Sequence, residues 1–305
     1  MSDRQLEVGS VSPANAEAAR CRLERCDNLD CMAKLPDAYC DLIYIDPPFN
    51  CGRTLGPTKV GDLRFVDVQE DGLQGYLRML TPRLREMRRL LSMHGSIYVH
   101  LDWRTVHHVR LQLDEIFGAD QFLNEIIWTY RSGGRQGKWF RRKHDTILAY
   151  ARSRGDHTFN PVREGTYKTQ ALSFDDDGRP YKNTRKGRLY FHPEGPAVGD
   201  VWDIPILSTV ANERTGYPTQ KPLRLINRII SAATNPGDMV ADFFCGSGTT
   251  LESALRLGRN TIGCDINTDA CDIARSRIEA VLAERDTART SPAPGVDIWN
   301  AAVSP

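Results

Sequence analysis

The chain alternates short apolar runs with longer segments in which apolar residues recur at helical spacing. The short runs predict strands over residues 41–46, 96–101, 124–130, 146–150, 239–243 and 261–265. Apolar residues three and four positions apart predict helices over residues 73–91, 105–117, 223–233, 249–257 and 269–283. Strands that alternate with helices of this length indicate an α/β fold, with a doubly wound and mostly parallel sheet covered on both faces.

Proline and glycine mark the limits of several of these elements. Pro82 lies inside the first predicted helix, where a proline cannot supply the backbone N–H, so we expect a kink or a break into two helices there. Gly95 is expected to end that element before the next strand begins. Gly118 and Gly258 follow two other predicted helices and mark their ends.

Composition places the chain among globular proteins. It has 305 residues, of which 40% are hydrophobic, enough for one large domain or two smaller ones. No run reaches the ~20 apolar residues of a membrane span, and the first residues are too polar for a secretory signal. We therefore expect a cytoplasmic protein with no membrane partner. Residues 1–20 and 286–305 are expected to be loose tails.

The eight cysteines form no Cys-x-x-Cys pair and no Cys/His set with zinc-finger spacing. In a reducing compartment they are expected to be free and mostly packed thiols. No metal site is expected.

The net charge of +1 conceals an uneven distribution. Residues 131–190 hold fifteen Lys/Arg and six Asp/Glu, a net charge of +9, so the rest of the chain carries −8. The same segment contains eight aromatic residues and two Gly-rich stretches. Basic residues interleaved with aromatics suit phosphate contacts and base stacking, although an isolated run of this kind is more often a solvated loop. The segment interrupts the alternation of strands and helices as an insertion.

A glycine-rich turn, Asp242-Phe-Phe-Cys-Gly-Ser-Gly-Thr-Thr250, joins a predicted strand to a predicted helix. Glycines let the backbone approach a ligand, and Asp265, 19 residues after Gly246, suits ribose hydroxyls. A P-loop is disfavoured because no Lys follows the second glycine, and Leu251 replaces the third glycine of a dinucleotide fingerprint. An acid before the glycines suits a cationic amino group, which points to S-adenosylmethionine. Alone, the motif could equally be a plain strand–helix turn.

A second motif, Asp46-Pro47-Pro48-Phe49, follows the first predicted strand directly. The prolines fix the backbone and have no N–H, so the polar groups left are acceptors: the Asp46 carboxylate and the Pro47 carbonyl. Two fixed acceptors beside an aromatic ring suit a flat base that carries an NH₂ group, such as a flipped adenine or cytosine. The simpler alternative is a strand terminator with a surface acid.

A third motif, Gly216-Tyr-Pro-Thr-Gln-Lys-Pro222, leads into the helix before the glycine-rich turn. Thr219, Gln220 and Lys221 would present donors at a helix N-terminus, where an anionic group is favoured. By itself the motif could be only a helix start.

Together, DLIYIDPPFN, GYPTQKP, DFFCGSGTT and GCDIN resemble, in this order, the beta-class amino-group DNA methyltransferases. The resemblance extends from about residue 26 to residue 283. It implies a Rossmann-like, S-adenosylmethionine-dependent methyltransferase fold with a circularly permuted motif order. The catalytic half would span residues 21–130, a target-recognition insertion residues 131–200, and the cofactor-binding half residues 201–285.

The resemblance also implies roles for particular residues. Asp46 and the Pro47 carbonyl would accept hydrogen bonds from the target amine, and Phe49 would stack on the flipped base, with Pro48 completing the catalytic motif. The expected cofactor-binding residues are Asp27, Asp46, Thr219, Gln220, Lys221, Asp242, Phe243, Phe244, Cys245, Gly246, Ser247, Gly248, Thr249, Asp265, Ile266 and Asn267. Asp27 departs from the family pattern, because Cys26 stands where a Gly usually precedes the acid. The expected DNA contacts are Arg131, Arg135, Lys138, Arg141, Arg142 and Lys143.

The expected reaction is direct methyl transfer from S-adenosylmethionine to an exocyclic amine of double-stranded DNA. In the resembling family, Asp before Pro-Pro accompanies adenine more often than cytosine, so adenine N6 is favoured and cytosine N4 is the alternative. Methylation at C5 of cytosine would need a nucleophilic Cys, and no Pro-Cys dipeptide exists in the chain, so this reaction is excluded. More remote alternatives are an RNA or protein-glutamine methyltransferase and an inactive DNA-binding relative. A homodimer and a cognate restriction enzyme are the further partners that the resemblance suggests.

Overall fold

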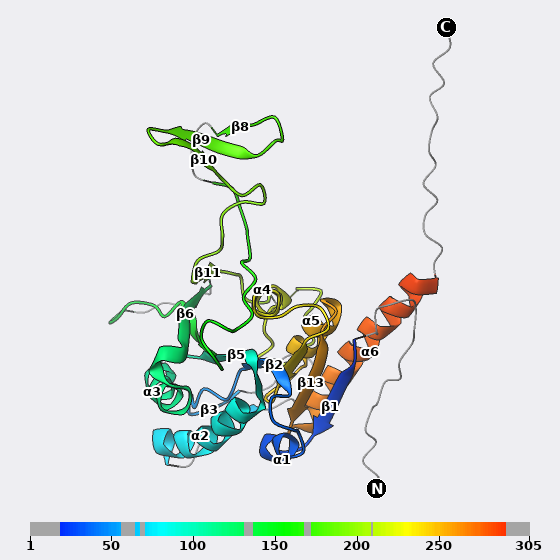
Figure 1. Ribbon diagram of the computed structural model, residues 1–305. Coiled ribbons are helices and arrows are strands. Elements are labelled where there is room, and N and C mark those ends of the chain that lie inside the picture. Colours follow the sequence, from blue (N-terminus) through cyan, green and yellow to red (C-terminus); the bar gives the residue numbers. More distant parts are fainter. Residues whose placement is uncertain are drawn as a thin grey trace.

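The computed structural model describes residues 19–55, 65–67, 71–130, 137–167, 172–208 and 210–290. Their centre is an eight-stranded sheet (Figure 1). In spatial order its strands are β1 (Cys21–Arg25), β13 (Asn260–Asp265), β12 (Met239–Asp242), β2 (Cys40–Ile45), β5 (Leu91–Leu101), β7 (His144–Ala151), β6 (Phe122–Thr129) and β11 (Val201–Asp203). All six predicted strands are present, and the edge strands β1 and β11 were not predicted.

Seven of the eight strands run in the same direction. The pairs from β1 through β13, β12 and β2 to β5 are parallel, as is the pair β6 and β11. Strand β7 is antiparallel to both of its neighbours, β5 and β6. The expected mostly parallel α/β fold is therefore confirmed.

Six α-helices of the described residues cover the sheet on its two faces. They are α1 (Asn28–Ala33), α2 (Gly72–Leu90), α3 (Val106–Phe117), α4 (Leu223–Ala233), α5 (Thr249–Arg256) and α6 (Thr268–Thr290). Strand β2 shows how the faces separate: Ile43 and Ile45 pack with α2 and α3, whereas Leu42 and Tyr44 pack with α4. This alternation follows from the two-residue period of a strand, and both faces of β2 are buried.

Helix α2 is continuous across Pro82, so of the expected kink or break the break into two helices does not occur. Pro82 cannot donate to the carbonyl of Arg78, and an interior proline costs about 3 kcal/mol. The buried residues of the helix, however, keep one apolar face at helical spacing: Tyr76, Leu80, Leu84, Met87 and Leu90. Each such side chain contributes roughly 1.5–3 kcal/mol on burial, which outweighs the cost of the proline.

Gly95 does not end the helical element, which is a second correction. The helix stops at Leu90, and β5 then runs through Gly95. A Cβ atom on Gly95 would lie 3.0 Å from the carbonyl oxygen of Cys40 and 3.1 Å from that of Asp41. The glycine is therefore used for the close approach of β2 and β5, where their register shifts.

The segment predicted as an insertion is not structurally uniform. Strand β7 belongs to the central sheet, whereas β8 (Ser173–Phe174), β9 (Pro180–Thr184) and β10 (Gly187–Tyr190) form a separate antiparallel sheet. Figure 1 shows this small sheet standing away from the central one. One strand of the main fold therefore divides the expected target-recognition segment.

The remaining described elements are short. They are the pair β3 (Arg53–Leu55) and β4 (Phe65–Asp67) and the 3₁₀ turn η1 (Ala119–Gln121). Helix α6 continues to residue 290, so the expected C-terminal tail begins later than predicted; residues 1–18 and 291–305 lie outside the described residues. Among the described helices, none has the length and apolar character needed to cross a membrane.

Candidate active site

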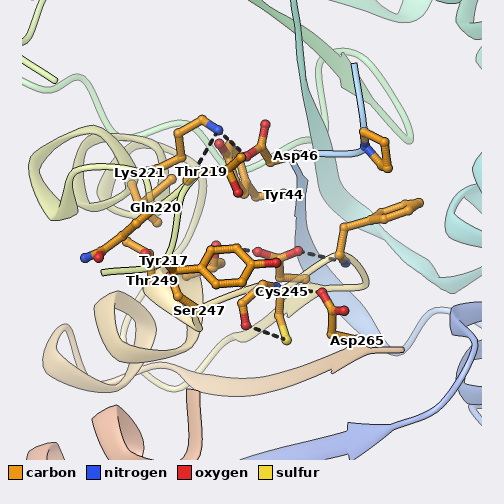
Figure 2. A pocket seen from close by; sticks show the side chains of 16 residues that line it. Tyr44, Asp46, Tyr217, Thr219, Gln220, Lys221, Cys245, Ser247, Thr249 and Asp265 are labelled. Carbon is orange, nitrogen blue, oxygen red and sulfur yellow. Dashed lines mark hydrogen bonds and ion pairs between the residues drawn. The ribbon is translucent and has the colours of Figure 1, made fainter. Parts of the chain in front are cut away.

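The carboxyl ends of the adjacent strands β13, β12 and β2 meet at one pocket, where open α/β sheets hold ligands. Its empty space is about 510 Å³, which includes the solvent at its open mouth. Its walls come from the end of β2, the loop before α4, the turn between β12 and α5, and the end of β13 (Figure 2). The lining residues are Tyr44, Asp46, Pro48, Tyr217, Thr219, Gln220, Lys221, Ile226, Asp242, Phe244, Cys245, Gly246, Ser247, Thr249, Thr250 and Asp265.

The turn from β12 into α5 depends on two glycines in the left-handed region. Gly246 has φ +47° and Gly248 has φ +76°, values that few other residues adopt without strain. A Cβ atom on Gly248 would lie 2.7 Å from the Cβ of Ala274 on α6. The N–H of Gly246 donates to the Asp265 carboxylate at 2.9 Å. The 19-residue spacing noted in the sequence therefore corresponds to a direct contact.

Asp242, the last residue of β12, is almost fully buried in the pocket wall. Its carboxylate accepts hydrogen bonds from the Thr250 hydroxyl at 2.6 Å and the Phe244 N–H at 3.0 Å. Burial raises the pKa of Asp242 to about 7; the two hydrogen bonds lower it, and the negative charges of Asp46 and Asp265 raise it. Three carboxylates therefore share one cavity, which favours a positively charged group between them.

Asp46 and Asp265 lie at opposite ends of the pocket (Figure 2). The Oδ2 atom of Asp46 contacts the Nζ atom of Lys221, which also donates to the Thr219 carbonyl at 3.3 Å. The Oδ1 atom of Asp46 is buried and accepts no hydrogen bond from the described residues. One oxygen of this carboxylate is therefore held by a cation, while the other is a buried acceptor with no donor among the described residues.

Gln220 shapes the loop that brings Lys221 to the pocket. Its side-chain oxygen accepts from the N–H and hydroxyl of Thr215 at 2.7 and 2.9 Å, and its amide donates to the Glu213 carbonyl at 2.5 Å. The Glu213 carboxylate in turn accepts from the N–H of Leu223, the first residue of α4. The third sequence motif is thus a cross-linked loop fixed to the start of a helix.

Comparison with known proteins decides the family. Residues 40–276 match the N6/N4 methyltransferase family model, which is described as DNA methylase. The chain belongs to the N6/N4 DNA methylase family.

This methylase has similar sequences and similar solved structures. It is 30% identical over 257 residues to the DNA adenine methyltransferase YhdJ of Escherichia coli (strain K12), covering 83% of this chain and 81% of the relative. The crystal structure of the M1.HpyAVI–SAM complex superposes with a TM-score of 0.56 at 19% identity, covering 85% of this chain and 98% of that one. PvuII DNA methyltransferase (cytosine-N4-specific) superposes with a TM-score of 0.58 at 15% identity, covering 87% and 91%. The two structural similarities show a shared fold.

Most of the residues predicted to bind the cofactor of the methylase lie in the pocket. They are Asp46, Thr219, Gln220, Lys221, Asp242, Phe244, Cys245, Gly246, Ser247, Thr249 and Asp265. The structure therefore gathers them at one place, and their contact with a cofactor stays a prediction.

Five residues predicted to bind the cofactor do not line this pocket. Phe243 is buried in the apolar core, and Gly248 packs against α6. Ile266 is exposed beside the pocket, and the side chain of Asn267 accepts from an N–H in the first turn of α6. Asp27 caps α1 through the N–H of Leu29 and forms a 2.7 Å ion pair with Arg83, so the structure shows a structural role for this acid.

The other residues of the Asp-Pro-Pro-Phe motif lie in or beside the pocket lining. Pro48 lines the pocket, while Pro47 and Phe49 lie just outside its lining. The Phe49 ring centre is 5.6 Å from that of His100 and 5.4 Å from Nζ of Lys221. The aromatic ring of the motif is therefore beside the carboxylate and its cation.

Only some of the residues predicted to contact DNA lie in the described part of the methylase. Lys138, Arg141 and Arg142 are exposed and Lys143 is half-buried, whereas Arg131 and Arg135 lie outside the described residues. The Arg142 guanidinium stacks 3.8 Å from the ring centre of Trp103, an exposed residue in the loop after β5. The sequence did not single out this tryptophan.

Several residues near the site were missed from the sequence. Tyr44 is two positions before Asp46, on the same face of the strand, so strand periodicity could have indicated it. Tyr217 and Thr250 lie inside quoted motifs and line the pocket. His100, fully buried behind Asp46, gave no signal because an isolated histidine in an apolar strand is usually a core residue.

The cysteines also form a cluster that their spacing did not reveal. Six of the eight cysteines are buried thiols. The Sγ atoms of Cys26, Cys31 and Cys264 lie within 4.8 Å of one another. The pairing of β1 with β13 brings these residues together, across more than 230 positions in the sequence.

Proposed function

We propose that this methylase transfers a methyl group from S-adenosylmethionine to the exocyclic N6 of an adenine that is flipped out of duplex DNA. The observation that carries the proposal is the Asp46 carboxylate, with one oxygen held by Lys221 and the other buried without a hydrogen-bond partner among the described residues. A buried acceptor without a donor is costly, and a donor such as an exocyclic NH₂ group would satisfy it.

The pocket has groups suited to each part of the proposed cofactor. Asp242 would hold the cationic amino group, because a nearby positive charge favours the ionised form of a buried carboxyl. Asp265, which already orders the glycine-rich turn, would accept from the ribose hydroxyls. When bound, S-adenosylmethionine supplies a methyl group activated by its sulfonium. The turn glycines permit the close backbone approach that such a ligand requires.

The residues around Asp46 would activate the target amine. The lone pair of an exocyclic amine is delocalised into the ring, which makes the nitrogen a weak nucleophile. Asp46 Oδ1 and the Pro47 carbonyl would each accept one of its protons. These hydrogen bonds strengthen as positive charge develops on the nitrogen, so they stabilise the transition state more than the ground state. Phe49 would stack on the displaced base.

Adenine is preferred over cytosine because of the acid before Pro-Pro. The relative YhdJ is called a DNA adenine methyltransferase, whereas PvuII methyltransferase is called cytosine-N4-specific. The shared fold accommodates both bases, so the fold supports neither choice.

The exposed cations of residues 137–143 would contact DNA phosphates beside the site. Lys138, Arg141 and Arg142 are exposed there, and Phe140 is 97% exposed. A cationic loop with an exposed aromatic ring suits phosphate contact and base stacking. Residues 131–200 are accordingly proposed as the target-recognition segment.

The test is methylation of duplex DNA with labelled S-adenosylmethionine, followed by mass spectrometry of the nucleosides. N6-methyladenine is expected, and N4-methylcytosine alone would refute the choice of base. Asp46→Ala should abolish transfer while cofactor affinity stays within a few-fold of the wild-type value. Asp37→Ala, which removes a largely exposed carboxylate in the same half of the fold, is the control. Full activity of Asp46→Ala would refute the assigned role.

A further inference from the structure

A chain of buried polar side chains extends behind Asp46, away from the pocket. The imidazole of His100, on β5, is fully buried. Its Nδ1 atom lies 2.9 Å from the Tyr44 hydroxyl and 3.7 Å from Asp46 Oδ1, and its Nε2 atom lies 3.3 Å from Asp145 Oδ2. The Tyr130 hydroxyl donates to the other oxygen of Asp145 at 3.1 Å.

Aromatic rings enclose the imidazole on the remaining sides. Its ring centre is 5.6 Å from that of Phe49 and 5.4 Å from that of Trp128, which it meets edge-on. Trp128 is held by a hydrogen bond from its indole N–H to the Ile204 carbonyl at 2.8 Å. The ring of His100 is therefore fixed in orientation, and its two nitrogens face different carboxylates.

The environment determines the direction of the hydrogen bonds in this chain. Burial, with the negative charges of Asp46, Asp242 and Asp145, raises the pKa of Tyr44 well above its usual value, so Tyr44 keeps its proton.

Asp145 sits at the other end of the chain. Burial would raise the pKa of Asp145, but the hydrogen bond of His100, its charge when the imidazole is protonated, the charge of Lys221 and the Tyr130 hydroxyl together lower it. Asp145 can then only accept. A neutral imidazole between the two must donate from Nε2 to Asp145 and accept at Nδ1 from Tyr44.

We propose that Asp145 fixes His100 in the Nε2–H form and thereby keeps Asp46 Oδ1 free to accept a proton of the target amine. The reverse form would carry its proton on Nδ1, 3.7 Å from Asp46 Oδ1, and would compete with the substrate for that oxygen. His100 and Asp145 are positioning residues in this proposal, because they act through Asp46. The proposal rests on the function proposed above.

The first measurement does not depend on activity. Nitrogen-15 NMR of the histidine side chains distinguishes the two neutral tautomers, and the signal of His100 is the one missing in His100→Gln. At the alkaline end of a titration, the wild-type protein should carry the proton on Nε2. In Asp145→Asn a substantial fraction should move to Nδ1. A wild-type proton on Nδ1, or an unchanged tautomer in Asp145→Asn, would overturn the proposal.

The second measurement is the methyl-transfer rate of the full chain. Asp145→Asn and His100→Gln should each lower kcat by about 100-fold, the size expected when a reacting group is displaced by about 1 Å. Cofactor affinity should stay within twofold of the wild-type value. The double variant should be no slower than the slower single variant, because both changes act on one unit.

Asp114→Asn is the matched control. It weakens another pairing of a tyrosine with an aspartate, the part-buried 2.5 Å bond from the Tyr150 hydroxyl, on the face of β7 that packs on α3. It should reduce thermal stability and leave kcat unchanged. If Asp145→Asn also lowers thermal stability and leaves kcat unchanged, the hydrogen-bonded side chains from Tyr44 to Asp145 have only a structural role and the proposal is wrong. If the wild-type protein methylates no DNA, the proposed function fails, and the tautomer measurement still decides the hydrogen-bond direction.

Discussion

The Nζ atom of Lys221 contacts Oδ2 of Asp46 across 175 positions of the sequence. Lys221 belongs to the loop before α4, and Asp46 follows β2, so the contact joins the two halves of the methylase fold. Both side chains are largely buried, with 12% and 16% of their surface exposed. The contact fixes one oxygen of the carboxylate, while the other, Oδ1, is buried and has no hydrogen-bond partner among the described residues.

Lys221→Met should therefore impair both folding and activity. Removing one partner of a buried ion pair costs about 3 kcal/mol, because the remaining charge loses its counter-charge. We expect kcat to fall by about 100-fold as the carboxylate reorients. Lys221→Arg keeps the charge and should retain most of the stability. Chemical denaturation and single-turnover transfer measure the two effects, and a Lys221→Met variant with wild-type kcat would contradict this role.

Cofactor binding should depend on pH through Asp242. The pKa of Asp242 is raised to about 7, chiefly by burial, and a cationic ligand group favours the ionised carboxylate. Affinity for S-adenosylmethionine should therefore increase as the pH rises through about 7, by up to about tenfold per unit, and level off above it. Calorimetry at pH 6 and pH 8 tests this. Asp242→Asn should bind weakly with little pH dependence.

The same carboxyl should affect stability in the opposite direction. Its pKa in the folded protein lies above the ~3.9 of an unfolded chain, so the unfolded chain loses this proton first as the pH rises. Its contribution to the free energy of unfolding should decline between about pH 4 and pH 7 in ligand-free protein. Asp242→Asn should flatten this decline. Asp238→Asn should flatten the decline in the same way, because burial also raises the pKa of Asp238, although that residue does not line the pocket.

Neutralising the loop beside the site should weaken DNA binding. In Arg141→Ala/Arg142→Ala/Lys143→Ala, the slope of log affinity against log salt should fall by up to about 3, since each phosphate contact contributes about 0.9. Fluorescence anisotropy at several salt concentrations measures this slope. Replacing the exposed Arg78, Arg85 and Arg275 by alanine removes the same charge elsewhere and should change the slope less. If the two triple variants lower the slope equally, the loop cations contribute no more to DNA binding than other surface cations.

Gly248→Ala should destabilise the glycine-rich turn. The new Cβ would lie 2.7 Å from Ala274 Cβ and 2.9 Å from its Cα, at a position with φ +76°. Strain of this kind costs about 1–3 kcal/mol, so the melting temperature should drop by several degrees and cofactor binding should weaken. Gly137→Ala, where no atom lies within 4 Å of the new Cβ, should melt like the wild-type protein. Similar melting of the two variants would contradict the steric argument.

Local sequence signals predicted the elements well where they agreed with packing. The helix over residues 223–233 was predicted with its observed bounds, and the strand before Asp46 within one residue. At Pro82, where the helix does not break, and at Gly95, which does not end the helical element, a local signal opposed tertiary packing. In both places the burial of neighbouring apolar residues or the approach of another strand decided the outcome.

The site was predictable in part for a similar reason. The residues within each motif are close in sequence, so their gathering at one sheet edge followed from the order of the strands. The pairing of Asp46 with Lys221 and the chain through His100 to Asp145 could not be predicted. These contacts depend on which strands become neighbours and in which direction each one runs.

The reversed direction of β7 has a mechanical consequence. A strand that opposes its neighbours starts at the edge where they end, so β7 begins beside the pocket, with Leu101 paired to Thr146. Asp145 is the second residue of β7 and comes two residues after Lys143, the last cation of the loop proposed to bind DNA. Tension or ordering imposed on that loop by a bound duplex would be transmitted along one short stretch of backbone to the residue that anchors His100. DNA binding and the orientation of His100 behind Asp46 would then be coupled without any movement between domains.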